Sequence, residues 1–378
     1  MKAERILGCG AWLKNAACLW SPDATVWSPV HGDLGDPEAR MALEDSVAEL
    51  IRSSAGSVHA IAHDLHPDFF STELAISVAQ QLYVPAIGVQ HHHAHIGAVI
   101  AAHQLERPVI GLALDGVGLG TDGHAWGGEL LWVDGPQWAR LGHFMPLALP
   151  GGDRAAREPW RMAASLLHAC GNSAQIVERF APIVGAQVAG GVAQMLDQKL
   201  NCPMTSSAGR WFDAVAGILG LCVRQQEEAQ AAQALERCAQ EWLNEHSDFV
   251  GTGGIAINTK NQLDPRPLFR DLIRTPAEQS GRAAARFHLA LCAALADWVI
   301  QASRQKQIRT VCLAGGCFYN RILSKRLSDQ LTNAGLEVLL PGKYGCGDAG
   351  LAIGQAWVAS QQMSAGTDAA SRGFELCV

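Results

Sequence analysis

The sequence lacks several patterns that would define its class at once. Its eleven cysteines include no Cys-x-x-Cys pair, which excludes a zinc-finger module and predicts reduced, mostly buried thiols in a cytoplasm. It has no long basic run, and its net charge is −7, which argues against nucleic acid or an anionic membrane as the main partner. It has no run of eighteen apolar residues, so no membrane span is expected. The first residues also lack the pattern of a secretory signal.

What is present is material for a large core. The chain has 378 residues, of which 48% are hydrophobic and 17% charged, with 39 glycines. This composition predicts two or three packed domains rather than disorder. The eleven tryptophans are scattered singly, as expected of core or interface residues rather than of a stacking platform for bases.

Apolar periodicity and turn residues predict the same order of elements twice. In the first part, three short strands precede alternating helices and strands, at 6–10, 15–20, 25–27, 37–51, 58–62, 71–82, 85–89 and 91–104. In the second part, after removal of a helical stretch, the order returns, at 109–115, 124–133, 138–144, 281–304, 310–314, 318–334, 336–340 and 349–360. A helix is also predicted at 154–169, before that helical stretch. We therefore predict an α/β fold of two duplicated, actin-like βββαβαβα lobes, 1–105 and 106–378, with a helical insertion at about 172–280.

The strongest candidate for chemistry is the run of histidines at 91–95, which follows a strand at 85–89 that is expected to be buried. A helix is predicted from His91, so His91 and His95 lie one turn apart on one face and can bind one ion. Asp115 is the first candidate for a further ligand, because it ends the apolar run 109–114 at the carboxyl end of a strand. The alternative is a solvated helix start without a ligand.

Two glycine-rich turns are candidates for binding a nucleotide. The loop 115–123 contains Gly118 and Gly120, where the missing Cβ atoms let backbone N–H groups approach phosphate oxygens. Gly315 and Gly316 lie between a strand and the helix opened by 318–320, with Asn320, and offer a helix N-terminus to an anion or a flat backbone to a nucleotide ring. An ordinary hairpin and a tight turn are the alternatives.

A second group of polar residues stands at predicted helix starts. Asp348 would cap a helix if it acted alone, but beside the histidine pair it becomes a candidate fourth ligand or a hydrogen-bond partner of one. Ser207 is expected to cap another helix. Arg210 is a candidate partner for a phosphate or carboxylate, and Asp213 either orients Arg210 or holds a ribose hydroxyl. A purely structural ion pair between the two is the alternative.

Two further candidates lie near the ends of strands in the first part. His63 belongs to a polar cluster, 63–67, after a predicted strand, where either substrate contact or a hydrogen-bonded turn is expected. Lys14 lies between the first two strands, in a hairpin that faces phosphate in actin-like proteins. It is therefore a candidate for neutralising phosphate charge, the alternative being a solvated turn.

Several segments together resemble the Kae1-like, C-terminal part of the HypF carbamoyltransferases of [NiFe]-hydrogenase maturation. They are 31–34, 63–67, 89–95, 114–129, 206–214 and 313–321. The resemblance covers nearly the whole chain. Related enzymes transfer threonylcarbamoyl to tRNA or carbamoyl to antibiotics, but segment 31–34 and the triple histidine favour the HypF branch.

The resemblance implies a metal ion, iron or zinc, held by His91, His95, Asp115 and Asp348. It implies that carbamoyl-adenylate, which derives from ATP and carbamoyl phosphate, lies beside this metal. It also implies that the carbamoyl group passes to the C-terminal cysteine of HypE, giving a thiocarbamate that later becomes a cyanide ligand of the hydrogenase iron.

The thiol proton needs an acceptor, and His92, His93 and His63 are the candidates. The nucleophile belongs to the partner, so none of this chain's cysteines is expected to react. The sequence departs from the family in Ala349, where glycine is usual, and in carrying no acylphosphatase, zinc-finger or YrdC-like module. We therefore expect an excised domain, or a short member that takes its activated carbamoyl group from elsewhere.

Three competing classes remain open. One is a sugar or acetate kinase of the actin-like superfamily, which would not need a His-x-x-x-His metal site. Another is an O-carbamoyltransferase that acts on a small hydroxyl compound. The third is a non-catalytic scaffold that binds HypE and whose nucleotide pocket is vestigial.

Overall fold

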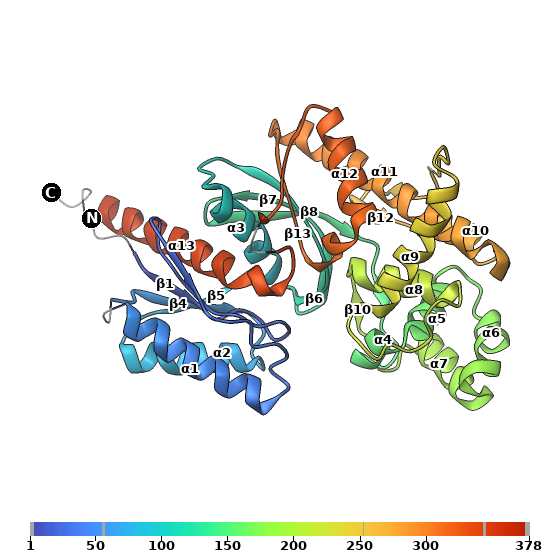
Figure 1. The fold of residues 1–378 in the computed structure, drawn as a ribbon, viewed down its shortest axis with the longest axis horizontal. Helices are drawn as coiled ribbons and strands as arrows, with labels where there is room; N and C mark the ends of the chain where they lie inside the picture. Colours follow the sequence, from blue (N-terminus) through green and yellow to red (C-terminus); the bar gives the residue numbers. More distant parts are fainter. Residues whose placement is uncertain (1–3, 55–56, 252, 343–344, 375–378) are drawn as a thin grey trace.

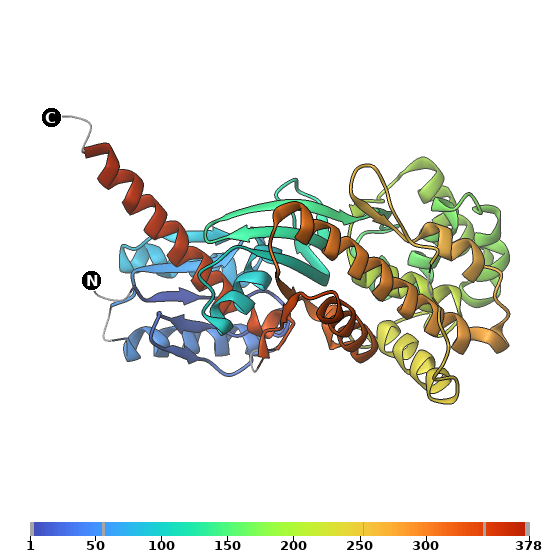
Figure 2. The same ribbon diagram turned by 90° about the horizontal axis from the view of Figure 1, so that it is seen from above.

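The fold is described from a computed structural model that places residues 4–54, 57–251, 253–342 and 345–374. Figure 1 shows three parts in a row, namely a small first lobe, a second lobe built on a larger sheet, and a helical region at the far end. The view from above keeps the same order (Figure 2).

The first lobe is a five-stranded sheet with the order β3-β2-β1-β4-β5, in which β4 and β5 run parallel to β1. Its elements are β1 (Ile6–Gly8), β2 (Cys18–Trp20), β3 (Thr25–Trp27), α1 (Pro37–Ser53), β4 (Ala60–Asp64), α2 (Phe70–Leu82), β5 (Ala86–Val89) and α3 (His91–His103). The strand predicted at 85–89 forms, but the expectation that it is buried was wrong. It is an edge strand in which only Val89 is buried, and a short apolar run does not distinguish an edge strand from a central one.

The second lobe repeats this topology. Its strands follow the order β8-β7-β6-β13-β14, and β12 and β11 extend the sheet beyond β8. Its elements are β6 (Val109–Leu119), β7 (Ala125–Asp134), β8 (Gln137–Phe144), α11 (Ser280–Lys306), β13 (Thr310–Ala314), α12 (Arg321–Asn333), β14 (Glu337–Leu339) and α13 (Leu351–Phe374). Each strand takes the place in its sheet that its counterpart has in the first lobe, so the predicted duplication is confirmed.

The helical region lies between β8 and α11 and shares one hydrophobic core with the second sheet. Its elements are β9 (Leu147–Ala148), α4 (Asp153–Arg157), α5 (Pro159–Ala169), α6 (Ala174–Val184), α7 (Ala186–Gln198), β10 (Met204–Thr205), α8 (Ala208–Ile218), α9 (Gln230–Glu245), β11 (Ala256–Ile257), β12 (Gln262–Asp264) and α10 (Arg266–Leu272). The single helix predicted at 154–169 is two helices, because Pro159 cannot continue the first and opens the second.

The last helix of each lobe packs on the sheet of the other lobe. α3 packs on β6 and β13, whereas α13 packs on β1 and β4, and the two helices also pack on each other. Figure 1 shows α13 along one face of the first sheet, with α1 and α2 on the opposite face. The contact is close, since a Cβ atom on Gly354 of α13 would lie 1.8 Å from the carbonyl oxygen of Ala94. This seam between the lobes contains His91 and His95 of α3, and Asp348 lies just before α13.

One segment of the described chain, Ala277–Lys306, is long and apolar enough to cross a membrane by length and composition. Its apolar window is 78% buried inside the protein. It contains α11, whose side chains fill the core of the second lobe. Buried core helices pass the same test of length and composition, so this finding is weak evidence for a span.

Candidate functional site

Four polar side chains from distant parts of the sequence meet at the seam. His91 and His95 lie in the first turns of α3, Asp115 lies on β6, and Asp348 opens a short 3-10 turn before α13. One nitrogen or oxygen atom from each residue lies within 4.8 Å of those of the other three. The structure thus brings together the four residues that were expected to bind a metal.

Local structure explains why these side chains converge. The Gln90 side chain accepts a hydrogen bond from the His93 backbone N–H and fixes the start of α3. The pairing of β6 with β7 shifts register between Leu114 and Gly118, and such a bulge redirects the side chain at that point. The Gly316 N–H then donates to Asp115 Oδ1 at 3.1 Å. Asp348 is the first residue of its 3-10 turn rather than the N-cap, which is Gly347, and its carboxylate faces the two histidines.

The spacing of the four side chains suits a small cation. Asp115 Oδ2 lies 3.3 Å from His91 Nε2 and 3.2 Å from His95 Nε2. Asp348 Oδ1 lies 3.7 and 3.5 Å from the same two nitrogens. Ligands that bind zinc tetrahedrally at 2.0–2.2 Å stand about 3.3 to 3.6 Å from one another. Two imidazole nitrogens and two carboxylates in this arrangement therefore fit a divalent metal ion such as zinc or iron.

The electrostatic interactions within the cluster, like its spacing, favour a cation. Burial opposes protonation of His91, but Asp64, Asp115 and Asp348 outweigh it and hold the pKa of His91 well above its usual value. Burial likewise opposes protonation of His95, but Asp115 and Asp348 outweigh it, so the pKa of His95 is also raised. Burial alone would raise the pKa of Asp115, yet the two imidazoles hold it well below the ordinary value. A cluster that attracts protons in this way favours any cation of the right size.

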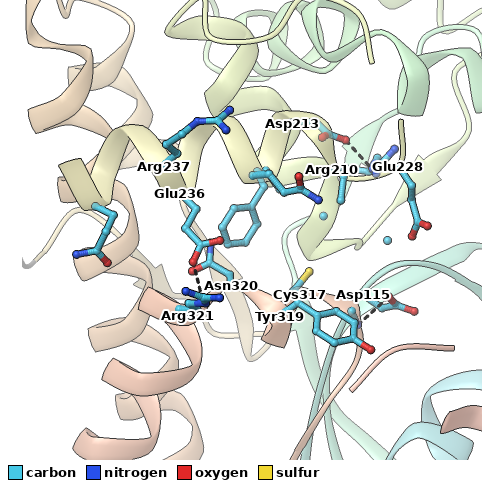
Figure 3. A pocket seen from close by; sticks show the side chains of 18 of the residues that line it. Asp115, Arg210, Asp213, Glu228, Glu236, Arg237, Cys317, Tyr319, Asn320 and Arg321 are labelled. Carbon is cyan, nitrogen blue, oxygen red and sulfur yellow. Dashed lines mark hydrogen bonds and ion pairs between the residues drawn. The ribbon is translucent and has the colours of Figure 1, made fainter. Parts of the chain in front are cut away.

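A large cavity begins at this cluster. It has a volume of about 810 Å³, and Asp115 and Gly116 form part of its wall. α8 and α9 line one side, with Arg210, Asp213 and the polar face of α9, and 316–321 line the other. Figure 3 shows Asp115 and Tyr319 at one end and Arg237 of α9 toward the other. The cavity is large enough for a nucleotide-sized ligand.

Comparison with known proteins identifies the family. Residues 1–102 match the model of the HypF Kae1-like domain, and residues 111–355 match that of the carbamoyltransferase Kae1-like domain, second subdomain. The chain belongs to the HypF family. The prediction of a carbamoyltransferase is thereby confirmed at the level of the family.

Two relatives and one solved structure show the extent of the match. The chain is 55% identical to a carbamoyltransferase HypF homolog of Cupriavidus necator, over 95% of this chain and 92% of that protein. It is 38% identical to carbamoyltransferase HypF of Rhizobium leguminosarum bv. viciae, over 94% of this chain but 45% of that protein. A crystal structure of full-length HypF in a phosphate- and nucleotide-bound form superimposes with a TM-score of 0.84 at 30% identity, over 94% of this chain and 55% of that one. The duplicated actin-like fold is thus confirmed, and the chain spans about half the length of these longer HypF proteins.

Not every glycine that was predicted to bind nucleotide lies on the cavity. A Cβ atom on Gly118 would lie 2.6 Å from the ring of His91, and one on Gly120 would lie 2.1 Å from that of Trp126. These two glycines make room for buried rings, and neither is among the described residues that line the cavity. The glycine of this loop that does line it is Gly116.

The two glycines after β13 differ in their relation to the cavity. Gly316 lines the cavity and hydrogen bonds to Asp115, as described above. Gly315 has φ of +100°, and a Cβ atom there would lie 2.2 Å from the carbonyl oxygen of Leu114, so its role is the turn itself. Asn320 lines the cavity and caps α12, and its amide lies 2.9 Å from His288 Nε2.

The residues around the start of α8 have two roles, since one caps the helix and two others line the cavity. Ser207 caps α8, and its hydroxyl donates to the carbonyl oxygen of Asp115 at 2.9 Å, which supports β6 at this point. Arg210 and Asp213 both line the cavity and form an ion pair at 2.9 Å. Burial raises the pKa of the Asp213 carboxyl to about 6, although Arg210 opposes the shift. The Arg210 Nε is buried without a hydrogen-bond partner, so this side chain retains a donor for a ligand, whereas Asp213 Oδ2 is engaged in the ion pair.

The three proposed catalytic residues lie in different surroundings. Lys14 lines the cavity and pairs with Glu228 at 3.0 Å. His92 is fully buried beside Trp126, and burial lowers its pKa well below the usual value. His63 donates from Nδ1 to the carbonyl oxygen of Asp64 at 2.7 Å. Neither histidine is among the described residues that line the cavity, so the geometry gives no support to either as a base for a substrate held there.

Sequence reasoning missed two parts of this site. Asp64 lies 2.7 Å from His91 Nδ1 and is completely buried, although it was considered only as part of a polar segment. A buried carboxylate at a strand end, next to the strand that leads into the histidine helix, is the signal that could have found it. The cavity wall formed by α9 was also missed, because its polar residues carry no distinctive motif.

Proposed function

We propose that this chain transfers a carbamoyl group from carbamoyl-adenylate, derived from ATP and carbamoyl phosphate, to the C-terminal cysteine of HypE in a cytoplasm. The thiocarbamate would then serve the synthesis of the cyanide ligands of [NiFe]-hydrogenase. The observation that carries the proposal is the cluster of two histidines and two aspartates at the end of a nucleotide-sized cavity. Family membership supports carbamoyl transfer, but the reaction of the longer HypF proteins is extended here to a chain of about half their length.

In this proposal the adenylate occupies the cavity with its acyl end toward Asp115. The phosphate- and nucleotide-bound form of full-length HypF supports the choice of a nucleotide. Gly316 and Asn320 lie along the wall where adenosine would bind, and Asp213, which lines the same cavity, would accept a hydrogen bond from a ribose hydroxyl. Arg210 and Lys14 would offset the charge of the phosphate.

The proposed metal ligands are His91, His95, Asp115 and Asp348, and the proposed ion is iron or zinc. A bound divalent ion supplies Lewis acidity, which polarises an acyl or phosphate oxygen and stabilises developing negative charge. The protein fixes the ligands through the Gly316 N–H on Asp115 and through the buried position of α3. The cysteine thiolate of HypE attacks the carbamoyl carbon, a C–S bond forms, the bond from that carbon to the phosphate oxygen breaks, and AMP leaves.

The decisive experiment compares carbamoylation of a peptide with the C-terminal sequence of HypE, given carbamoyl-adenylate, by the unaltered protein and by His95→Ala. Loss of an ion that contributes several kcal/mol to the transition state is expected to slow transfer about 1000-fold. Bound metal, measured by elemental analysis, should fall with the rate.

The matched control is His103→Ala, which removes an exposed imidazole from the last turn of the same helix. It is expected to keep both metal and activity. Equal rates for His95→Ala and the unaltered protein would remove the metal from the chemistry. Metal binding without any carbamoylated peptide would overturn the proposed acceptor.

A further inference from the structure

We propose that Asp64 is a positioning residue that fixes the ring of His91 for metal binding. The inference rests on the proposed metal site and goes beyond it, because Asp64 has no place among the ligands. Asp64 is the last residue of β4, and its side chain is completely buried. Its Oδ2 lies 2.7 Å from Nδ1 of His91.

The two ring nitrogens of His91 face carboxylates on opposite sides. Nε2 faces Asp115 and Asp348 of the second lobe, whereas Nδ1 faces Asp64 of the first lobe. A carboxylate accepts the proton of Nδ1–H, so the lone pair of a neutral ring is left on Nε2, toward the cation. The same hydrogen bond fixes the rotation of the ring and increases the basicity of Nε2.

Asp64 is itself held in place. Its Oδ1 accepts a hydrogen bond from the His66 N–H at 2.9 Å. Its carbonyl oxygen accepts from the Thr72 hydroxyl at 3.2 Å and from His63 Nδ1 at 2.7 Å. A buried carboxylate is costly unless it is paired, and here both of its oxygens have a partner. This assigns a role to His63 and the polar segment around it, which supports the carboxylate rather than the cavity.

The two imidazoles of the site are therefore not equivalent. Among the described residues, no carboxylate is paired with the second ring nitrogen of His95, whose Nε2 faces Asp115 and Asp348. His91 is held from both lobes, and His95 faces the acidic groups of one. Asp64 should thus affect metal affinity through His91 alone.

The test replaces Asp64 by asparagine, which has nearly the same shape but no charge. Binding of Zn²⁺ to the whole chain is measured by competition with a chelator, and binding of Co²⁺ by its visible absorption bands. Affinity for both ions is expected to fall about 10- to 100-fold, and the Co²⁺ bands are expected to change as the ligand field weakens. The matched control is Asp68→Asn, an exposed aspartate four residues further on, which should leave both measurements unchanged.

A structural role and a positioning role give different results. If Asp64 only stabilises the fold, Asp64→Asn lowers the melting temperature equally with and without Zn²⁺, and the Co²⁺ spectrum of the folded protein stays the same. That result, or an affinity within twofold of the unaltered protein, overturns the inference and leaves the proposed function intact. Asp64→Glu keeps a carboxylate and should bind Zn²⁺ more tightly than Asp64→Asn, and the reverse order would also overturn it. If the unaltered protein binds neither ion, the proposed metal site and this inference fall together.

Discussion

The two lobes have the same strand order but contribute differently to the site. Among the described residues that line the cavity, Lys14 is the single one from the first lobe, and the others come from the second lobe and its helical region. The first lobe supplies instead the two imidazoles and the carboxylate that holds one of them. The duplicated fold thus provides two similar frames, one of which lines most of the cavity while the other supplies the two histidines of the cluster. Experiments on the seam, on the second lobe and on the contact across the cavity can test this division.

The largest effect is expected where the lobes meet. Gly354→Ala would place a methyl group 1.8 Å from the carbonyl oxygen of Ala94, so α3 and α13 would have to move apart. We expect a loss of about 3 kcal/mol in the free energy of unfolding, measured by urea denaturation. The matched control is Gly191→Ala, at an exposed position in the middle of α7 with open space around it. That change should stabilise the protein by about 0.5 to 1 kcal/mol. Similar losses for both variants would contradict the close seam.

The second effect lies wholly within the second lobe and depends on pH. Burial raises the pKa of Asp213 from 3.8 to about 6, so between these values the folded state holds a proton that the unfolded state releases. The stability that this proton provides is complete below about pH 4 and is lost as the pH rises through about 6. Its complete loss should lower the free energy of unfolding by about 3 kcal/mol, of which about 1 kcal/mol falls between pH 5 and pH 7. Urea denaturation at pH 5 and at pH 7 measures this fall in the free energy of unfolding. Asp213→Asn has no carboxyl at this position, so its free energy of unfolding should fall less between the two pH values than that of the unaltered protein. In the exposed control Asp134→Asn the decrease should remain, and a parallel profile for both variants would refute the buried, uncharged carboxyl.

The smallest effect concerns the contact across the cavity. Lys14 of the first lobe pairs with Glu228 at 3.0 Å, and both side chains are about half exposed. If Lys14 offsets phosphate charge, Lys14→Met should weaken binding of AMP about fivefold, or about 1 kcal/mol. Glu228→Gln frees Lys14 for the phosphate and should strengthen it.

Calorimetry at low and high salt would check both variants of this pair, since the difference should shrink as salt screens the charges. Each variant serves as a control for the other, because the two are expected to change the affinity for AMP in opposite directions. A change in the same direction for both would show that the pair affects the shape of the cavity rather than its charge.

The order of elements was predictable because period and turn chemistry are local. The strand predicted at 310–314 has the predicted bounds, and the helix predicted from His91 starts at that residue. The helix predicted at 154–169 is interrupted at Pro159. The edge position of β5 could not be predicted from its own residues, because it depends on which strands pair in the sheet.

The site was predictable to the extent that its residues carry a spacing. His91 and His95 are one turn apart, and Asp115 ends an apolar run, so their convergence could be expected. The prediction that Asp115 also ends its strand was wrong, because β6 continues past a bulge to Leu119. Gly118 and Gly120 were assigned to phosphate because a missing side chain signals a close approach but does not say what approaches. Here it is an imidazole and an indole ring. The partner of His91 was missed because the pairing of β4 with β5, which aligns Asp64 with Val89, is a long-range contact.

The exchange of helices between the lobes has a consequence for how the protein is made. The face of the first sheet that α13 covers precedes α13 in the sequence by the whole of the second lobe. On the ribosome, that apolar face has no cover until α13 has been synthesised. The nascent first lobe should therefore depend on chaperones for longer than an independent domain of its size, and synthesis of α13 should be the step after which its native core can close.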